Sequence, residues 1–183
     1  MEKVVSSALA GVVLMLTGGS VNSQAQSGEV TTVNHVDLKR YIGTWYEIAR
    51  LPNSFQKQCA RNTTATYTLR DDGRIDVLNK CTKSDGDVSQ ANGVARIVDT
   101  TTNAKLEVSF VRFLGIQFFW GDYWIIGLDS EYRYAIVGTP SRKYGWILSR
   151  TPALSDEDQR TAFEILRSQG YNPSEFIKTE QTR

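Results

Sequence analysis

The fold of this chain is decided by the stretch Gly43-Thr44-Trp45-Tyr46-Glu47-Ile48-Ala49-Arg50. It predicts a strand in which Trp45, Glu47 and Ala49 share one face, because strand side chains alternate. A tryptophan two residues after a glycine is typical of the floor of a small barrel. The glycine lets a neighbouring backbone approach closely, and the indole supplies a large apolar plate with one N–H that needs a partner. The triplet alone is a weak signal, so its meaning depends on the rest of the chain.

Length and charge limit the classes of protein to consider. The chain has 183 residues, which suits a single domain. Its 21 basic and 20 acidic side chains give a formal net charge of +1. Because the positive and negative charges nearly cancel, the composition does not indicate a nucleic-acid partner or binding to a strongly anionic surface. The hydrophobic fraction of 40% is ordinary for a globular protein.

The first 25 residues predict a signal peptide rather than part of the fold. An apolar run over 4–16 is followed by Ser23-Gln24-Ala25, a small-x-small cleavage site. A membrane helix is the alternative, but the apolar run is too short for one. No lipid-attachment cysteine stands near this segment, so we expect a soluble exported protein, periplasmic or secreted. Residues 26–34 are polar and are expected to be flexible.

The two cysteines, Cys59 and Cys81, are predicted to form a disulfide. An even pair in an exported chain favours a bridge, and a turn at Asp71-Asp72-Gly73 brings the two close together. The alternative is a reactive thiol at the mouth of the barrel.

Short strands separated by turns follow one another up to residue 150. The turn signals include Asp71-Asp72-Gly73 and Ser84-Asp85-Gly86-Asp87. The predicted strands are 43–50, 63–69, 75–79, 91–98, 106–110, 122–129, 134–138 and 144–150, with an apolar and glycine-containing connection at 113–121. Eight up-and-down antiparallel strands can close into a barrel that holds one small ligand.

The pattern changes to that of a helix at about 155–169. Ser155 is a good N-cap, acidic residues follow it in the first turn, and Gly170 ends the segment. Its single apolar stripe must cover the outside of the barrel. Phe176-Ile177 can add a short terminal strand. The predicted fold class is therefore all-β, an eight-stranded up-and-down barrel with a C-terminal helix, in one domain over 35–183.

Three segments resemble the lipocalin family. They are 36–52, 65–73 (ATYTLRDDG) and 146–152 (WILSRTP), and they are most similar to the group that comprises bacterial outer-membrane lipocalins, apolipoprotein D and plant temperature-induced lipocalins. The resemblance covers residues 36–177. The second family motif matches only loosely, at Asp129 and Tyr132. The bacterial relatives are lipoproteins anchored through a cysteine that is missing here, which argues against the same anchoring.

The resemblance implies a structural motif made by Gly43, Trp45 and Arg150. If Trp45 closes the barrel floor, the Arg150 guanidinium can lie across the indole, a contact worth about 2 kcal/mol when it is shielded from water. The family also implies storage or transport of a small hydrophobic ligand, fatty acids or lysophospholipids, linked to membrane maintenance or stress, with a possible association with the outer membrane.

Alternation along the strands predicts which side chains line the cavity. They are mostly apolar and aromatic with few polar groups, which suits an acyl chain with its head near the open end. The predicted ligand-binding residues are Glu47, Ala65, Tyr67, Val77, Asn79, Val108, Phe110, Tyr123, Ile125, Val137, Tyr144 and Trp146. The alternative is that aromatic side chains fill the interior completely.

Other functions have less support in the sequence. A hydrolytic triad needs a histidine, and the single histidine, His35, precedes the barrel. No cysteine or histidine cluster predicts a metal, so we expect no enzyme, no catalytic residue, no metal and no cofactor. One enzymatic alternative is a free thiol at Cys59 acting on lipid. Another class is an interaction module, monomeric or dimeric, in which the apolar segment 113–120 touches a membrane or a partner.

Overall fold

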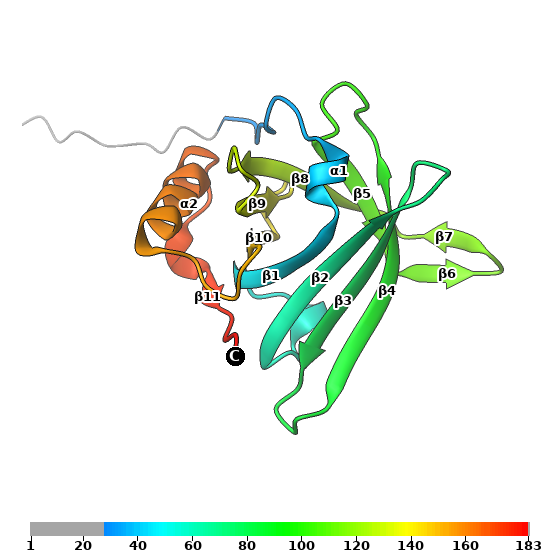
Figure 1. The fold of residues 1–183 in the computed structure, drawn as a ribbon, viewed down its shortest axis with the longest axis horizontal. Coiled ribbons are helices and arrows are strands. Elements are labelled where there is room, and N and C mark those ends of the chain that lie inside the picture. Colours follow the sequence, from blue (N-terminus) through cyan, green and yellow to red (C-terminus); the bar gives the residue numbers. More distant parts are fainter. Residues whose placement is uncertain (1–27, 183) are drawn as a thin grey trace, which may run out of the picture.

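Eight antiparallel strands form a closed barrel in the computed structural model, which describes residues 28–182 (Figure 1). Neighbouring barrel strands pair in chain order, and the first barrel strand, β1, pairs with the eighth, β10, to close the barrel. The barrel strands are β1 (Gly43–Arg50), β2 (Arg61–Leu69), β3 (Ile75–Thr82), β4 (Val88–Ile97), β5 (Lys105–Ser109), β8 (Gly121–Leu128), β9 (Tyr134–Gly138) and β10 (Gly145–Ser149). The all-β fold class and its eight strands are confirmed.

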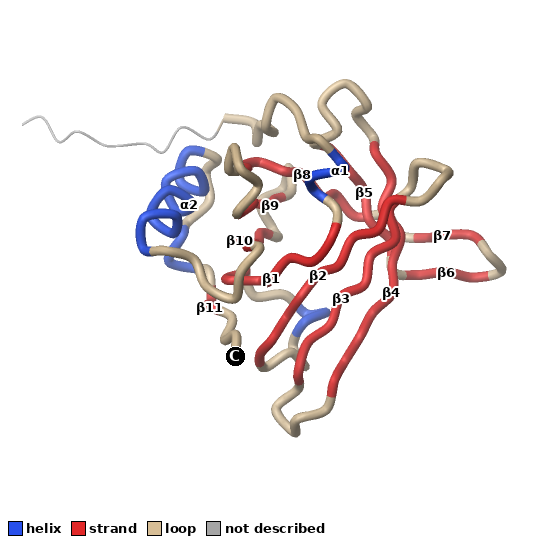
Figure 2. Tube along the Cα trace, viewed as in Figure 1, coloured by secondary structure: helices blue, strands red, loops and turns tan. Residues whose placement is uncertain are grey.

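A hairpin over 111–118 overlaps the connection predicted at 113–121. It consists of β6 (Val111–Phe113) and β7 (Ile116–Phe118), which pair only with each other. Its turn uses Leu114 at φ 47° and Gly115 at φ 84°, the positive values that a two-residue hairpin turn requires. Figure 2 shows the hairpin projecting from the barrel wall on the side opposite α2.

The C-terminal helix α2 (Asp156–Ser168) covers the outside of the barrel, as predicted. Its cap is Ser155, whose side chain accepts from the Asp158 N–H, and its first turn is acidic. Ala162 and Leu166 are fully buried against strand residues that face outward, such as Ile136 and Ile147. A separate apolar cluster, the barrel core, lies inside the barrel.

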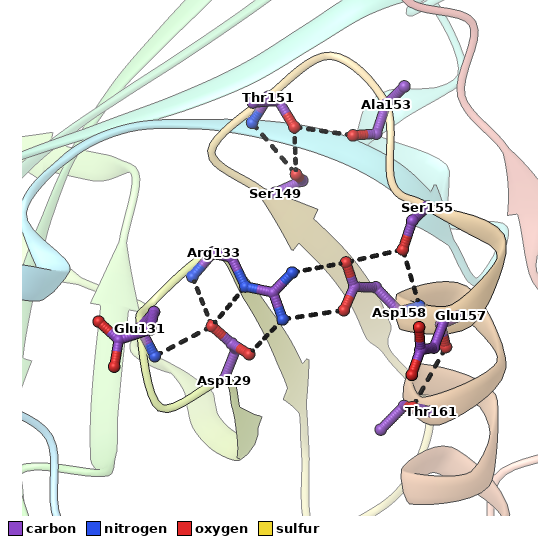
Figure 3. Close-up of polar contacts among 10 residues, drawn as sticks. All are labelled: Asp129, Glu131, Arg133, Ser149, Thr151, Ala153, Ser155, Glu157, Asp158 and Thr161. Carbon is purple, nitrogen blue, oxygen red and sulfur yellow. Dashed lines mark hydrogen bonds and ion pairs between the residues drawn. The ribbon is translucent and has the colours of Figure 1, made fainter.

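An arginine in the turn between β8 and β9 joins the barrel to the start of α2. The Arg133 guanidinium donates to both carboxylate oxygens of Asp158, at 2.9 and 3.0 Å, and to Asp129 on its other side (Figure 3). Ser155 donates to the same Asp158 carboxylate at 2.9 Å. This bidentate contact fixes the register of the helix on the barrel.

The leading segment lies against the barrel from residue 28 onward. Val30 is buried with the helix-facing cluster, and Thr31 N–H donates to the Gln169 side chain at 2.8 Å. The short helix α1 (Leu38–Tyr41), capped by Asp37, leads directly into β1. The polar composition of residues 26–34 gave no sign of these contacts. The predicted signal peptide, residues 1–25, lies outside the described residues.

The C-terminal tail fills a gap between β1 and β2. These two strands pair only from Gly43 to Tyr46 along β1 and then diverge. After the 3-10 helix η2 (Pro173–Glu175), β11 (Ile177–Lys178) pairs with the far end of β1, and Glu180 bridges to Arg61. The terminal strand is thus present one residue later than predicted.

A bulge near the end of β1 changes which side chains face inward. The register with β10 shifts between Glu47 and Ala49, so Arg50 lies opposite the inward Trp146. Ala49 lies opposite Ile147 and joins the outer cluster. The strict alternation predicted for 43–50 is therefore wrong beyond Glu47, because a bulge inserts one extra residue.

Within residues 28–182, no helix combines the length and apolar character needed to cross a membrane.

Candidate functional site: the barrel interior

The barrel floor is closed by Trp45 and Arg150. Trp45 is fully buried, and its indole N–H donates to the Tyr41 carbonyl at 2.8 Å. The Arg150 guanidinium lies 3.7 Å from the centre of the indole ring. Its N–H groups donate to the carbonyls of Thr44, Arg40, Tyr41 and Ile42 at 2.6–3.1 Å. The guanidinium thereby supplies hydrogen-bond donors to the backbone carbonyls where α1 ends and β1 begins.

Gly43 is favoured at this crossing by its backbone conformation. Its φ of 97° is one that other residues rarely adopt. Space is not the reason, because a Cβ there would make only an ordinary contact with Arg150 Nη1, at 3.4 Å.

Three tyrosines lie directly above the floor. The Tyr123 hydroxyl bonds to those of Tyr41 and Tyr67, at 2.8 and 3.0 Å. Burial raises the pKa of Tyr67 to about 12, and burial also raises the pKa of Tyr41 and of Tyr123 well above the ordinary value. With Trp45, these rings pack on one another at the floor end of the barrel, its lower half, and the end nearer the mouth is its upper half.

The raised tyrosine pKa values predict a loss of stability in strong alkali. The unfolded chain ionises its tyrosines near pH 10, whereas the folded barrel keeps these three neutral. Their contribution is therefore fully present below pH 10 and is lost as pH rises toward 12. Urea unfolding at pH 9 and pH 11 should show a lower free energy of unfolding at pH 11. Tyr67→Phe should flatten this dependence, and an equal slope in both proteins would contradict the assignment.

Ten of the twelve predicted ligand-binding residues lie on the inward face. Tyr67, Val77, Ile125 and Val137 are buried in the barrel core, and Ala65, Val108, Tyr123 and Trp146 pack against it. Asn79 shares its face with Val77, and Glu47 shares its face with Trp45. Four inward positions in the upper half are partly exposed to solvent, and a fifth, Ala91, is exposed; the four are Ala65, Asn79, Val108 and Trp146. The upper interior is therefore open to solvent at its mouth.

The remaining two predicted residues lie at the rim. Phe110 follows the end of β5 and is 42% exposed, outside the core cluster. Its ring covers Gly93, where an added Cβ would come within 2.7 Å. Tyr144 precedes β10 and stacks on Trp146 with ring centres 6.2 Å apart. Because Gly93 lies opposite the inward Val77, the Phe110 ring covers the inner face of this wall, and its inward placement stays a prediction.

A buried polar cluster lies on the inner wall of the upper half. Arg50 Nη1 donates to Glu47 Oε1 at 2.8 Å and to the Thr179 hydroxyl at 3.1 Å. The other carboxylate oxygen, Glu47 Oε2, accepts from the Gln56 amide at 2.7 Å. Trp146 Nε1 in turn donates to Gln56 Oε1 at 3.1 Å. The polar cluster therefore joins β1, β10, the C-terminal tail and the loop after β1.

That loop carries the 3-10 helix η1 (Ser54–Gln56), which covers part of the mouth. Phe55 packs on Tyr144 and Trp146, with ring centres 5.4 and 6.4 Å apart. Alternation along strands cannot find Gln56 or Thr179, because both come from segments outside the predicted barrel strands. Tyr41 was missed for the same reason, although a tyrosine one helical turn before Trp45 is a usable signal.

Cys59 and Cys81 form a disulfide, as predicted. It ties the end of the η1 loop to β3 near the mouth. The thiol that the enzymatic alternative needs at Cys59 is consumed by this bond. Among residues 28–182, no three His, Cys, Asp or Glu side chains gather as metal ligands would.

Removing the disulfide is expected to destabilise the barrel without changing its shape. The bridge spans a sequence separation of 22 residues, which the loop-entropy relation converts to about 3 kcal/mol. The double variant Cys59→Ser/Cys81→Ser should lose this amount in urea unfolding, and its circular dichroism should stay that of the parent. A loss below about 1 kcal/mol would show that the loop is already ordered in the unfolded chain.

Comparisons with known proteins agree with this architecture. The model of the lipocalin-like domain matches residues 36–181. The outer membrane lipoprotein Blc of Escherichia coli (strain K12) is 45% identical over 153 residues, 83% of each chain. Temperature-induced lipocalin-1 of Arabidopsis thaliana is 41% identical over 84% of each chain, and apolipoprotein D of Mus musculus is 35% identical over 79% of this chain and 77% of its own.

The solved structure of insecticyanin from the tobacco hornworm Manduca sexta shares the fold. It aligns with a TM-score of 0.69 at 24% identity and covers 85% of this chain and 86% of its own. The closed eight-stranded barrel, its Trp45–Arg150 floor and these relatives agree, and the chain belongs to the lipocalin family.

Proposed function

We propose that this protein binds one small amphiphile, a fatty acid or a lysophospholipid, in the upper half of its barrel for storage or transport. The observation that carries the proposal is a closed barrel whose inward face is apolar and, near the mouth, open to solvent. The relatives carry lipocalin and lipoprotein names, which supports a hydrophobic ligand of this general kind.

The energetics permit binding without a specific head-group contact. Each buried methylene contributes about 0.8 kcal/mol, so an acyl chain with a dozen methylenes gains roughly 10 kcal/mol. Association and ordering cost about 4–15 kcal/mol. Because the filled floor shortens the available space, the acyl chain must either stop above the tyrosines or bend toward the mouth.

Displacement of a fluorescent fatty acid, with native mass spectrometry of the purified protein, tests this function. We expect saturable binding of one ligand per chain and a co-purifying lipid of matching mass. Absence of both would end the proposal.

The same geometry supports a binding protein rather than an enzyme. The only thiols of the chain are joined to each other, and His35 is exposed on the segment before the barrel. Free-thiol titration of the native protein should find no reactive thiol. Two free thiols would revive a lipid-modifying activity at Cys59.

We further propose that the protein is exported and loses residues 1–25. A disulfide suits an oxidising compartment, and a relative is named an outer membrane lipoprotein. Intact-mass measurement of the exported form should show a mature chain that starts at Gln26.

A second function, contact with a membrane surface, is favoured by the β6–β7 hairpin. Seven apolar residues between 110 and 119 are at least 40% exposed: Phe110, Val111, Phe113, Leu114, Ile116, Phe118 and Phe119. Beside the hairpin lies a groove of about 390 Å³ whose lining includes Arg74, Arg96 and Trp120. Apolar side chains at a projecting tip, with arginines and an indole at its base, suit insertion among lipid head groups.

Polar substitutions at the hairpin tip are expected to abolish this contact. Burying each of Phe113, Leu114 and Ile116 is worth about 1.5–3 kcal/mol. Replacing all three by serine should weaken co-sedimentation with vesicles of anionic and zwitterionic phospholipid by at least about tenfold. Val98→Ser, at an exposed valine far from the hairpin, is the matched control. Unchanged sedimentation of the triple variant would contradict the membrane contact, whatever the barrel binds.

A further inference from the structure

The mouth end of β4 has a backbone edge with no neighbouring strand in the part of the chain that the structure describes. β4 pairs with β3 from Val88 to Ala95, but with β5 only from Val94 onward. Residues 88–93 therefore have a strand on one side only, and Figure 1 shows this end of β4 at the border of the sheet. An open edge of this kind is a site for pairing with a further strand.

The hydrogen-bond pattern identifies the backbone groups at this edge. In the turn that joins β3 to β4, the Lys83 N–H donates to the Asp87 carbonyl at 2.8 Å. Because the direction of these groups alternates along an antiparallel strand, Val88, Gln90 and Asn92 point their N–H and C=O groups away from β3. Among residues 28–182, these groups have no backbone partner.

The β6–β7 hairpin continues the β5–β8 pair in the same register. Val108 lies opposite Gly121, and three residues further along each strand Val111 lies opposite Phe118. The two pairs therefore form one long hairpin that bends at 109–110 and 119–120. Without the bend, β6 would run on beside β4, because β5 pairs with β4 up to its last residue.

An unbent hairpin would supply the partners that the β4 edge lacks. Continued past the end of β5, the β4–β5 register places Asn92 opposite Val111 and Gln90 opposite Phe113. At both positions β4 presents its open N–H and C=O groups, so β6 would complete their hydrogen bonds.

The bend also exposes a side chain that strand alternation assigns to the inward face. Trp120 lies on the outside of the barrel, where the Arg96 guanidinium is 4.2 Å from the centre of its ring, so the neighbouring Phe119 belongs to the inward set. Phe119 is instead 84% exposed and adopts a φ of 56°, which is unfavourable for a bulky side chain. Unbending would bring Phe119 opposite Phe110 on the inner face and relieve this conformation.

A buried hydroxyl holds the hairpin in its bent position. Ser109 Oγ accepts from the Val111 N–H at 3.3 Å and donates to the Phe118 carbonyl. The Val111 N–H is one of the groups that β6 would offer to β4 in the unbent position. Ser109 therefore competes with β4 for the same donor.

We propose that the β6–β7 hairpin is a flap that moves between this bent position and an unbent one, in which β6 pairs with the β4 edge and extends the wall of the upper half around a bound amphiphile. The inference rests on the proposed binding of an amphiphile in the barrel, and it adds how the ligand is retained. Arg112 would share the inward face near the mouth, where its long side chain can keep the guanidinium in water.

A disulfide trap tests whether the unbent position is reached. The register places Ala91 opposite Arg112, at a pair without mutual hydrogen bonds, where Cα atoms come closest. Ala91→Cys/Arg112→Cys should form a second disulfide on mild oxidation, identified by peptide mass analysis with Cys59–Cys81 intact. Val88→Cys/Arg112→Cys is the matched control, because it is three residues, or about 10 Å, out of register and beyond the reach of a disulfide.

A bound ligand should favour the unbent position. Saturating dansyl-labelled undecanoic acid should speed formation of the in-register bridge at least about threefold. The bridged protein should release this acid at least about tenfold more slowly than the oxidised control variant, because affinity differences appear mainly in the dissociation rate.

Two further substitutions in the same cysteine background should move the flap in opposite directions. Ser109→Ala removes the competitor for the Val111 N–H and should speed bridging, whereas Phe119→Gly relieves the bent position and should slow it, each at least about threefold. If thermal unfolding shows that the cysteine variant is not folded, hydrogen exchange of the parent protein decides. The amides of Gln90 and Asn92 should exchange more slowly with the labelled acid bound, and unchanged exchange would contradict the flap.

The outcomes separate the flap from the carrier function. If the labelled acid does not bind the parent protein, the carrier function fails, and bridging without ligand still tests the movement. If the folded in-register variant does not bridge, or the control bridges equally fast, the flap is wrong even when the acid binds in the barrel. Retention by the flap is also wrong if the bridged protein releases the acid as fast as the control does.

Discussion

Trp45→Ala is expected to lower the free energy of unfolding by about 3–5 kcal/mol, the usual cost of truncating a buried tryptophan. The side chain is completely buried, and its loss removes the plate on which Arg150 lies. The truncation would also leave an empty space beside Tyr41, whose ring centre is 5.1 Å from that of the indole. Urea unfolding monitored by circular dichroism measures the loss.

Trp45→Phe is the control for this prediction. It keeps a ring beneath the guanidinium but loses the indole N–H that bonds to the Tyr41 carbonyl, so we expect a smaller loss. Ligand affinity of the folded Trp45→Phe protein should equal that of the parent, because three tyrosines separate the floor from the upper interior. A loss below 1 kcal/mol in Trp45→Ala would show that the Trp45–Arg150 floor contributes little to the stability of the barrel.

Arg50→Ala is expected to destabilise the protein by about 3–5 kcal/mol, because it leaves the Glu47 carboxylate buried without its cation. The remaining donors to that carboxylate are the amide of Gln56 and the hydroxyl of Thr179, which are neutral. The measurement is urea unfolding at pH 7.

Removing both charges together should lower the free energy of unfolding by much less. In Glu47→Gln/Arg50→Met no charge stays buried, so the double variant should be more stable than Arg50→Ala alone. This non-additivity is the signature of a buried ion pair. If the double variant lost the sum of both single effects, the two side chains would be acting independently.

Local sequence patterns are sufficient for the barrel strands. The turn at Asp71-Asp72-Gly73 joins β2 to β3 as predicted, because aspartate and glycine tolerate the backbone angles of a tight turn. The cap at Ser155 and the glycine at 170 bound the helix within a residue of its predicted ends. Each of these signals acts over a few residues, so one sequence carries it in full.

Features that depend on distant parts of the chain were not predictable. The bulge that brings Arg50 inward depends on how β1 fits β10, and alternation within 43–50 contains no sign of it. The contacts of Thr179 and Gln181 with β1 require the tail to occupy a gap between two strands. The apolar character of 113–121 was visible, but its hairpin depends on Leu114 adopting a positive φ, which is uncommon for leucine.

The candidate site, too, was predictable only in its locally determined part. The apolar inward residues follow from strand alternation, and Tyr67, Val77, Ile125 and Val137 lie where alternation puts them. The polar cluster does not follow, because Gln56 comes from a loop and Thr179 from the tail.

Tryptophan quenching by a fatty acid brominated along its chain tests the central claim most directly, because bromine quenches only on contact. Trp146 lies on the inward face, and Trp120 lies outside the barrel beside Arg96. If the ligand occupies the barrel, quenching should saturate at one ligand per chain, fall sharply in Trp146→Phe and stay unchanged in Trp120→Phe. Quenching that fails to saturate, or that is lost in Trp120→Phe and kept in Trp146→Phe, would contradict a ligand inside the barrel.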